Sequence, residues 1–452
     1  MGKLNKNANS AKITKAMWFL VVLAAMGGFL DSYDLISIGA ATFIASSYHE
    51  LVVTSTDIAW ANSAAFGGAI FAALAAGAYS DRVGRRTLFI LDLLLFVIAA
   101  PLQALVTNIQ QLIVLRLLIG VAIGIDIPVA WTLICETAPS QQRGKLVSMM
   151  FTFWAVGGLI SFLVAIALLP LGAISWRILL ASGAIPAIVV FLLRRNVPES
   201  PRWLSSQGRD QEARLATSAL QGDVTDYQIA PTEKISNPKK SSYAELFTTY
   251  WRTALFEGVF MFVFAATGLL LSIYPARIFA QLGLAGFKNS LYIGAFSWLI
   301  ILLGMMSCAF LVDRVGRRPL SYIGSLGVAI ALFLLTKVPA NNFPMFFGAF
   351  FLFAYLAVLG GWGPAWVYQT EIFPTAIRAT GAGFAGSMNR VGAAVAAFGV
   401  PVFMARYGFN SLLYLFIVAN LVLFLVLVVF GFETKGKSLE EIESLARGRS
   451  KN

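Results

Sequence analysis

The sequence predicts an all-α integral membrane protein in which twelve transmembrane helices form two parallel six-helix halves. Composition is the first observation, because 58% of the 452 residues are hydrophobic and only 12% are charged. The second is a set of about twelve apolar runs, each close to the roughly 20 residues that cross a hydrocarbon core about 30 Å thick. The third is a long-range repeat of short motifs, which indicates two similar halves in one orientation.

Each predicted helix corresponds to one apolar run. In chain order the runs cover 17–44, 59–79, 87–106, 111–135, 147–169, 176–193, 253–275, 289–312, 320–338, 344–370, 380–404 and 410–432. The first run is too long for the apolar core of a signal peptide, so we expect it to remain as the first helix.

The distribution of basic residues predicts the orientation in the membrane. Of 34 Lys and Arg, 27 lie in the two termini and the loops after even-numbered helices, five lie in the other loops, and Arg116 and Arg390 lie within helices. Because basic residues concentrate on the cytoplasmic side, both termini are predicted to be cytoplasmic in a cell inner membrane. The net charge of +12 therefore reflects topology, and we expect a monomer in a lipid bilayer with no nucleic-acid partner.

Three motifs recur at nearly one offset. The hexapeptide "DRVGRR" occurs twice, 232 positions apart; "ETAPSQQR" is followed by "EIFPTAIR" 235 positions later, and the glutamates of "PESPRWL" and "FETKGKSL" are 234 positions apart. We predict an N-terminal half at 17–204 and a C-terminal half at 251–433, joined by a cytoplasmic linker at 205–250 and flanked by cytoplasmic segments at 1–16 and 434–452. Within the linker, "DQEARLATSAL" is predicted to form a short amphipathic helix on the membrane surface.

Two parallel six-helix halves are the architecture of the major facilitator transporters. The motifs "DRVGRR", "PESPRW", "EIFPTAIRATG" and "FETKGKSLEE" resemble those of the sugar porter and metabolite:proton symporter branch of that superfamily. The resemblance covers nearly the whole chain and implies a secondary active transporter that works by alternating access, not an enzyme. We expect no cofactor and no metal site, since the one histidine, His49, lies in the first external loop.

The predicted solute site departs from that of hexose porters. The seventh helix of hexose porters carries a glutamine pair that binds sugar hydroxyls, whereas Phe262 and Val263 stand at about these positions here. A site for many hydroxyls needs many donors and acceptors, so we expect a small organic solute other than an ordinary hexose. The candidates for the wall of this site are Ile127, Trp131, Thr152, Trp154, Tyr355, Trp362 and Trp366.

Acidic residues within the helices predict proton coupling. Asp31 and Asp34 lie three residues apart, near one face of the first helix, and Asp34 matches the helix 1 aspartate of proton-coupled sugar porters. Asp92 and Asp126 resemble acidic positions of phosphate:proton symporters and their metabolite:proton relatives. With Arg116 as the one cation at comparable depth in this half, at least one carboxyl should bind a proton.

One other interpretation of the membrane acids stays open. All four acids could be structural, with hydrogen bonds to the backbone or to neighbouring helices. Glu257 is expected at the cytoplasmic end of the seventh helix, in the membrane interface.

The repeated loop motifs predict a cytoplasmic gate. The family resemblance implies that their acids and bases pair while the site faces outward and separate when it faces inward. The two predicted sets are Asp81, Arg85, Glu136 and Arg143 in the first half, and Asp313, Arg317, Glu371 and Arg378 in the second.

Two rival functions remain at this stage. An organic-anion or phosphate:proton symporter of the same fold would need a cation facing the cavity, for which Arg116 is the candidate. A non-transporting sensor on a transporter scaffold usually carries a long cytoplasmic extension, and this chain ends about twenty residues after the last predicted helix.

The orientation can be tested by labelling from outside the cell. In a variant without Cys135 and Cys308, we expect a membrane-impermeant maleimide to label a cysteine at position 49 and to miss a cysteine at position 225. Labelling of position 225 in intact cells would reverse the predicted topology.

Overall fold

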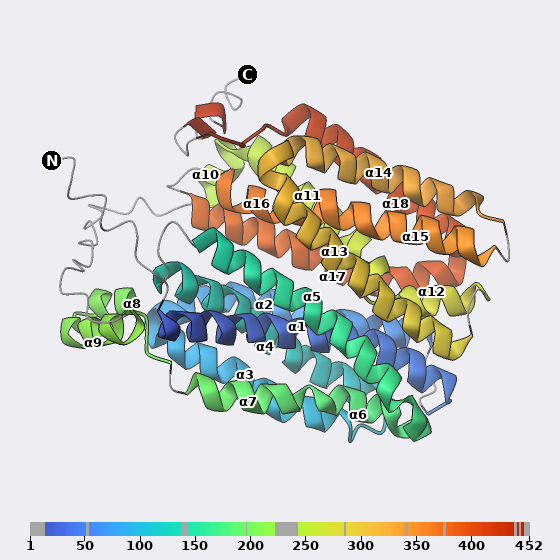
Figure 1. Ribbon diagram of the computed structural model, residues 1–452, viewed down its shortest axis with the longest axis horizontal. Coiled ribbons are helices and arrows are strands. Elements are labelled where there is room, and N and C mark those ends of the chain that lie inside the picture. The colour runs from blue at the N-terminus through green and yellow to red at the C-terminus, as the bar shows by residue number, and fades with distance from the viewer. Residues whose placement is uncertain are drawn as a thin grey trace. The chain divides into compact units, whose positions relative to one another are not determined.

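The structure is a computed structural model of the chain. It describes residues 14–50, 54–137, 143–195, 197–221, 243–283, 286–339, 342–373, 377–437, 441–442 and 444–446, although some side chains in these ranges, chiefly 74–82 and 127–151, are not described. Every regular element among the described residues is a helix, as the sequence predicts (Figure 1).

The helices follow the predicted apolar runs closely. The first are α1 (Lys15–Ser47), α2 (Ser55–Val83), α3 (Arg85–Gln103), α4 (Ile109–Thr137), α5 (Arg143–Leu168), η2 (Leu169–Ile174), α6 (Ser175–Ser182), α7 (Ala184–Arg194), α8 (Pro201–Ser206) and α9 (Asp210–Gln221). The rest are α10 (Tyr243–Thr248), α11 (Trp251–Ser272), α12 (Pro275–Gln281), α13 (Phe287–Val315), α14 (Arg317–Lys337), α15 (Phe343–Ala357), η3 (Val358–Trp362), α16 (Gly363–Glu371), α17 (Arg378–Tyr407) and α18 (Phe409–Phe430).

The twelve predicted transmembrane helices can be matched to these elements. Among the described residues, ten stretches are long and apolar enough to cross a membrane. One of the ten, Thr152–Arg194, contains both the fifth and the sixth predicted helix, and α2 accounts for the remaining one.

Two predicted helices are interrupted and a third is followed directly by a short separate helix, each time near a residue with a backbone constraint. The sixth divides into α6 and α7 just before Pro186, which has no N–H to continue the helical hydrogen bonds. The seventh, predicted over 253–275, ends as α11 at Ser272, and Pro275 then begins the separate helix α12. The tenth contains the π-helical turn η3, where Gly360 lies so close to Gly324 of α14 that a Cβ on either residue would overlap the other's backbone.

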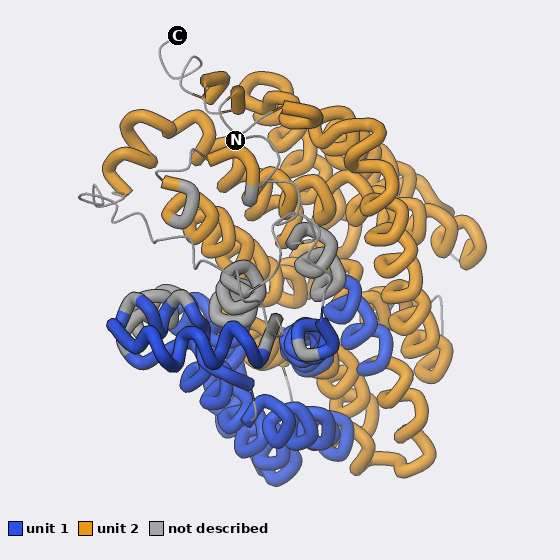
Figure 2. Tube along the Cα trace, turned by 60° about the vertical axis from the view of Figure 1, so that its left-hand side comes forward, with its two compact units in different colours: residues 1–35, 68–161, 177–237 blue, residues 36–67, 162–176, 238–452 orange. Residues whose placement is uncertain are grey.

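The chain divides into two compact units (Figure 2). Unit 1 contains residues 1–35, 68–161 and 177–237, and unit 2 contains the remainder, so that α1, α2, α5 and α6 each contribute to both units. In unit 1, α3 packs against α4 and α7; in unit 2, α11 packs against α17, and α14 packs against α15 and α18 (Figure 1).

The segment between the halves is more helical than predicted. The amphipathic helix is confirmed as α9, whose Ala213 and Ala216 pack against Leu204 and Trp203 of α8. Residues 243–248, which the sequence assigns to the linker, form α10.

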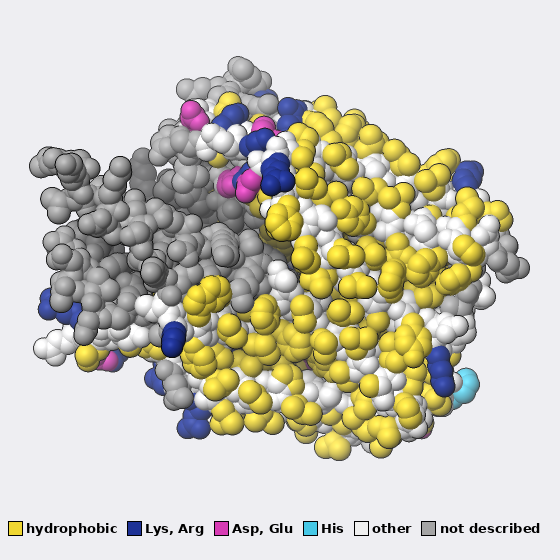
Figure 3. All heavy atoms as spheres, viewed as in Figure 1, with side chains coloured by type: hydrophobic (Ala, Val, Ile, Leu, Met, Phe, Trp, Pro, Cys, Tyr) yellow, Lys and Arg dark blue, Asp and Glu magenta, His cyan; other side chains and the backbone are white. Residues whose placement is uncertain are grey.

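Apolar side chains are exposed along the long helices, as a bilayer requires. On α18, Val418, Leu425 and Val429 are 58%, 60% and 63% exposed. Figure 3 shows hydrophobic side chains over most of the described part of one face. In contrast, the interior of unit 1 contains buried charges, including Asp31, Asp92, Arg116 and Arg194.

Candidate functional site

A polar stripe runs along the part of α1 that belongs to unit 1. Gly27, Asp31 and Asp34 are four and three residues apart, so they lie on one face of the helix. Both aspartates are buried, with exposures of 0% and 2%. The stripe therefore turns toward the interior of the protein rather than toward lipid.

Asp34 forms a buried ion pair with Arg116 of α4. The Nη1 group of Arg116 donates to Oδ2 of Asp34 and also to its backbone carbonyl at 3.2 Å. Gln103 at the end of α3 donates from Nε2 to the other carboxylate oxygen at 3.5 Å. Arg116 is fully buried, and its Nε and Nη2 have no hydrogen-bond partner among the described residues. The guanidinium thus retains donors for a second acceptor.

A second buried cluster joins Asp92 of α3 and Asp126 of α4 through Arg194. Nη1 of Arg194, at the end of α7, lies 2.9 Å from Oδ2 of Asp92 and 2.8 Å from Oδ1 of Asp126. The same guanidinium donates to the carbonyls of Phe89 and Leu23 at 3.0 and 3.2 Å, and it lies 3.5 Å from the centre of the Phe89 ring. The guanidinium of Arg194 therefore forms ion pairs with two carboxylates.

Arg194 corrects the prediction that Arg116 is the one cation at this depth in the first half. In the sequence, Arg194 directly follows the apolar run 176–193 and so counts as a loop residue. In the structure it is fully buried, because two carboxyls, two carbonyls and an aromatic face together offset the loss of its hydration. The described carboxyls of this region thus outnumber its guanidiniums by four to two.

Gly27 lets α1 approach the second cluster. A Cβ at this position would overlap the carboxylate of Asp126 and the guanidinium of Arg194. Since Gly27 and Asp34 share one face, the stripe on α1 contacts both ion-pair centres, and Asp31 lies between them in the sequence.

The predicted wall residues of unit 2 fall into two groups. Trp362 and Trp366 both pack edge to face with Phe264 of α11, with ring centroids 6.0 and 6.5 Å apart. The Trp362 indole lies against Gly268, where a Cβ would come within 2.8 Å of Nε1. Tyr355, in contrast, packs with Leu359 against α13 and α14.

On α5 of unit 1, Thr152 is exposed and Trp154 is half-buried. Six predicted site residues have side chains that the structure does not describe: Asp81, Ile127, Trp131, Glu136, Arg143 and Arg378.

The gate residues that are described in unit 2 form an ion-pair cluster. Arg317 lies 2.8 Å from Asp313 and 2.9 Å from Glu371. Glu371 also accepts a hydrogen bond from the hydroxyl of Thr434 at 2.7 Å. The start of α14 is thereby tied to the end of α16 and to the segment after α18.

Two glutamates that were not predicted as site residues cap the helices after the repeated "DRVGRR" motif. Glu199 accepts the backbone N–H groups of Arg85 and Arg86 at 3.0 and 3.1 Å. Glu433 accepts those of Arg317 and Arg318 at 3.1 and 3.0 Å. Each carboxylate binds free N–H groups at the positive end of a helix, which stabilises both. The common offset of the two glutamates is the sequence signal for this role.

Glu257 of α11 corrects another expectation. The residue is fully buried rather than interfacial, and neither carboxyl oxygen has a hydrogen-bond partner among the described residues. Next to it, Gly258 lies against Phe384 of α17. An ionised carboxylate without a partner costs several kcal/mol in such surroundings.

Comparison with known proteins places the chain among membrane transporters. The model of a family described as "Sugar (and other) transporter" matches residues 20–446. The chain is 31% identical to the arabinose-proton symporter of Bacillus subtilis, covering 95% of this chain and 96% of that protein. It is 28% identical to the niacin transporter NiaP of Acinetobacter baylyi, covering 95% and 97%. A structure of the proton:xylose symporter XylE, a transporter from E. coli, has a TM-score of 0.78 at 25% identity and covers 96% of this chain and 100% of that chain.

The capping role of Glu433 can be tested at Gly316. Gly316 has a φ of 110°, and a Cβ there would lie 2.6 Å from the Glu433 carboxylate, whereas Gly408 has a φ of 81° and open space around it. Alanine in this backbone conformation costs about 1–3 kcal/mol by itself. We expect Gly316→Ala to lower the thermal unfolding midpoint in detergent further than Gly408→Ala, because it also displaces the cap. Equal decreases would contradict the capping role.

The burial of Glu257 leads to a second stability test. We expect Glu257→Gln to leave the unfolding midpoint nearly unchanged, since a carboxyl buried without a charged partner stays protonated and the neutral amide keeps its shape. Glu371→Gln should lose about 1–3 kcal/mol, because its carboxylate binds Arg317 and Thr434. If Glu257→Gln were as destabilising as Glu371→Gln, Glu257 would have a charged partner.

Proposed function

Because the chain belongs to the sugar (and other) transporter family, we propose that it is a proton-coupled symporter that takes up a small organic solute by alternating access. The chain is a multi-pass membrane transporter with the twelve-helix major facilitator fold, and not an enzyme. The observation that carries the proposal is the buried ion pair between Asp34 and Arg116.

The ion pair supplies a physical route to coupling. A proton on Asp34 removes the charge that holds Nη1 of Arg116, and the guanidinium then needs another acceptor. The free donors at Nε and Nη2 are suited to a polar group of the solute. Proton binding and solute binding would then favour one another, which is the requirement for symport.

The charge balance of unit 1 supports proton binding. Four buried carboxyls accompany two guanidiniums, Arg116 and Arg194, in the described part of this region. An excess of two negative charges in a low-dielectric interior favours protonation of at least one carboxyl. We assign the coupling proton to Asp34, because it matches the helix 1 aspartate of proton-coupled sugar porters and because its partner Arg116 retains free donors for the solute.

Similar proteins support both proton coupling and the transport of a small organic solute. The proteins named arabinose-proton symporter and proton:xylose symporter are similar to this chain over nearly their whole length. Inward movement of each proton contributes about 2.3 kcal/mol per 100 mV of membrane potential.

We propose a solute with few hydroxyl groups. Phe262 and Val263 stand where hexose porters carry amides, and the aromatic group of Trp362, Trp366 and Phe264 is apolar. An organic anion is the second candidate, favoured by the free donors of Arg116 and by the similarity to the niacin transporter. Counterflow with niacin, arabinose and phosphate as separate solutes distinguishes these classes.

We further propose that the protein lies in the cytoplasmic membrane with both termini inside, so that Arg317, Asp313 and Glu371 face the cytoplasm. Their ion pairs would close the cytoplasmic side while the solute site faces outward. Thr434 would link the same cluster to the C-terminal segment.

The coupling role of Asp34 is testable in proteoliposomes. We expect Asp34→Asn to retain exchange of solute across the membrane but to lose uphill uptake driven by a pH gradient, because the amide keeps the shape and cannot titrate. Asp210→Asn on the exposed helix α9 is the matched control and should behave as the wild type.

Two outcomes would contradict this assignment in different ways. Wild-type accumulation by Asp34→Asn would move the proton site to Asp31, Asp92 or Asp126. Absence of pH-driven uptake in the wild-type protein, with exchange intact, would make the protein a facilitator.

A further inference from the structure

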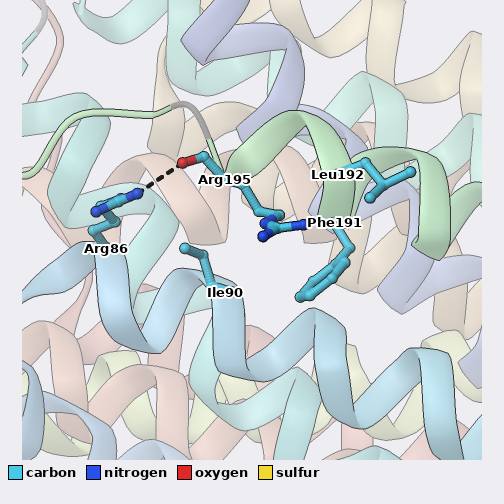
Figure 4. A pocket seen from close by; sticks show the side chains of 5 residues that line it. All are labelled: Arg86, Ile90, Phe191, Leu192 and Arg195. Atoms are coloured by element: carbon cyan, nitrogen blue, oxygen red, sulfur yellow. Dashed lines mark hydrogen bonds between the residues drawn. The ribbon is translucent and has the colours of Figure 1, made fainter.

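A hollow of about 620 Å³ lies between α3 and α7 in unit 1. Its lining consists of Arg86 and Ile90 from α3, Phe191 and Leu192 from α7, and Arg195 just after α7 (Figure 4). It is separate from the buried carboxyl clusters, since none of their residues line it. The hollow combines two cations with an apolar floor.

Arg86 is held at the hollow by a hydrogen bond, and Arg195 lines the hollow beside it. Nη2 of Arg86 donates to the backbone carbonyl of Arg195 at 2.7 Å, which ties the start of α3 to the end of α7. Figure 4 shows the guanidinium of Arg195 directed back toward Ile90 and Phe191. Both arginines are exposed, and no carboxylate of the described side chains forms an ion pair with either. Their charges are therefore available to an external anion.

The position of the hollow indicates which type of anion it binds. On the same two helices, apolar side chains such as Leu94, Ile98, Ile188 and Val189 are exposed, as on a lipid-facing surface. The hollow lies where α3 begins and α7 ends, at the boundary between this apolar surface and the charged end of the helices. Arginines at such a boundary place their guanidinium groups at the depth of lipid headgroups.

The second half of the chain provides an internal comparison. Arg318 is the repeat equivalent of Arg86 at the offset of 232, and it also donates to a carbonyl, that of Val428, at 3.2 Å. The equivalent of Arg195 at the offset of 234 is Val429, which is 63% exposed. The hydrogen bond between the two helices thus occurs in both halves, whereas the second cation occurs at this position in the first half alone.

We propose that the hollow between α3 and α7 binds an anionic phospholipid, with its phosphate between Arg86 and Arg195 and an acyl chain on Ile90, Phe191 and Leu192. Guanidinium groups bind phosphate oxygens through paired N–H donors, and two of them match a headgroup of net negative charge. Basic pockets between transmembrane helices on the cytoplasmic side bind such headgroups. The apolar floor favours a lipid over a soluble phosphate.

The test uses the purified full-length protein in detergent. Retention of phosphatidylglycerol, with phosphatidylcholine as the neutral reference, is measured by native mass spectrometry, and the lipid-induced shift of the unfolding midpoint is measured in parallel. We expect phosphatidylglycerol to be retained selectively and to stabilise the wild type. Each of Arg86→Gln and Arg195→Gln should weaken retention by about fivefold.

Two further variants separate charge at this hollow from charge in general. Arg318→Gln removes the equivalent arginine of the second half and should leave retention unchanged. The double variant Arg86→Lys with Arg195→Lys keeps the charge and should retain the lipid more strongly than the double glutamine variant.

Three results would overturn the proposal. One is equal retention of phosphatidylglycerol and phosphatidylcholine by the wild type. Another is undiminished selectivity in the double glutamine variant. The third is stabilisation by inorganic phosphate equal to that by the lipid, with loss in the same variants, which would assign the hollow to a soluble anion.

Discussion

The interior of unit 1 depends on one constraint: its buried carboxylates must be paired with positive charge. Each ion that leaves water costs several kcal/mol, and removal of one partner from a buried pair destabilises a protein by about 3–5 kcal/mol. Asp34 meets this cost with Arg116, and Asp92 and Asp126 meet it jointly with Arg194. The positions of α1, α3, α4 and α7 within the unit are thus coupled through two guanidinium groups. A protonation event at either centre changes the forces between helices, which connects the charge of a single side chain to helix packing.

Much of the fold could be predicted because the membrane imposes simple rules on sequence. Helix length follows from bilayer thickness, so the twelve apolar runs match the helices within a few residues. The breaks are harder to predict. Pro186 and Pro275 are visible signals, but the π-helical turn at Val358–Trp362 depends on contact between two glycines from different helices, which the local sequence does not contain.

The candidate site could be predicted only in part, for the same reason. Burial of Asp31 and Asp34 follows from their place within an apolar run. The identity of the cation that pairs with Asp92 and Asp126 does not follow from the sequence. Arg194 lies at the end of its apolar run and turns inward through contacts with Phe89 and Leu23, which are more than 100 residues away. Likewise, burial of Glu257 is a tertiary property, since its distance from the end of α11 alone favours the interface.

The π-helical turn of the second half and the Arg194 cluster of the first half occupy corresponding places in the two repeats. By the offsets of 232 to 235, the equivalents of Asp92, Asp126 and Arg194 are Gly324, Gly361 and Val428. The glutamate caps occur in both halves, whereas among the described residues the ionisable cluster occurs in the first half alone. In the other copy, Gly324 instead contacts the backbone of Gly360 directly. The two repeat-related helix junctions thus use different interactions, buried charge in one and close backbone contact in the other, so an acid introduced at Gly324 would find Val428 where the first half places the guanidinium of Arg194.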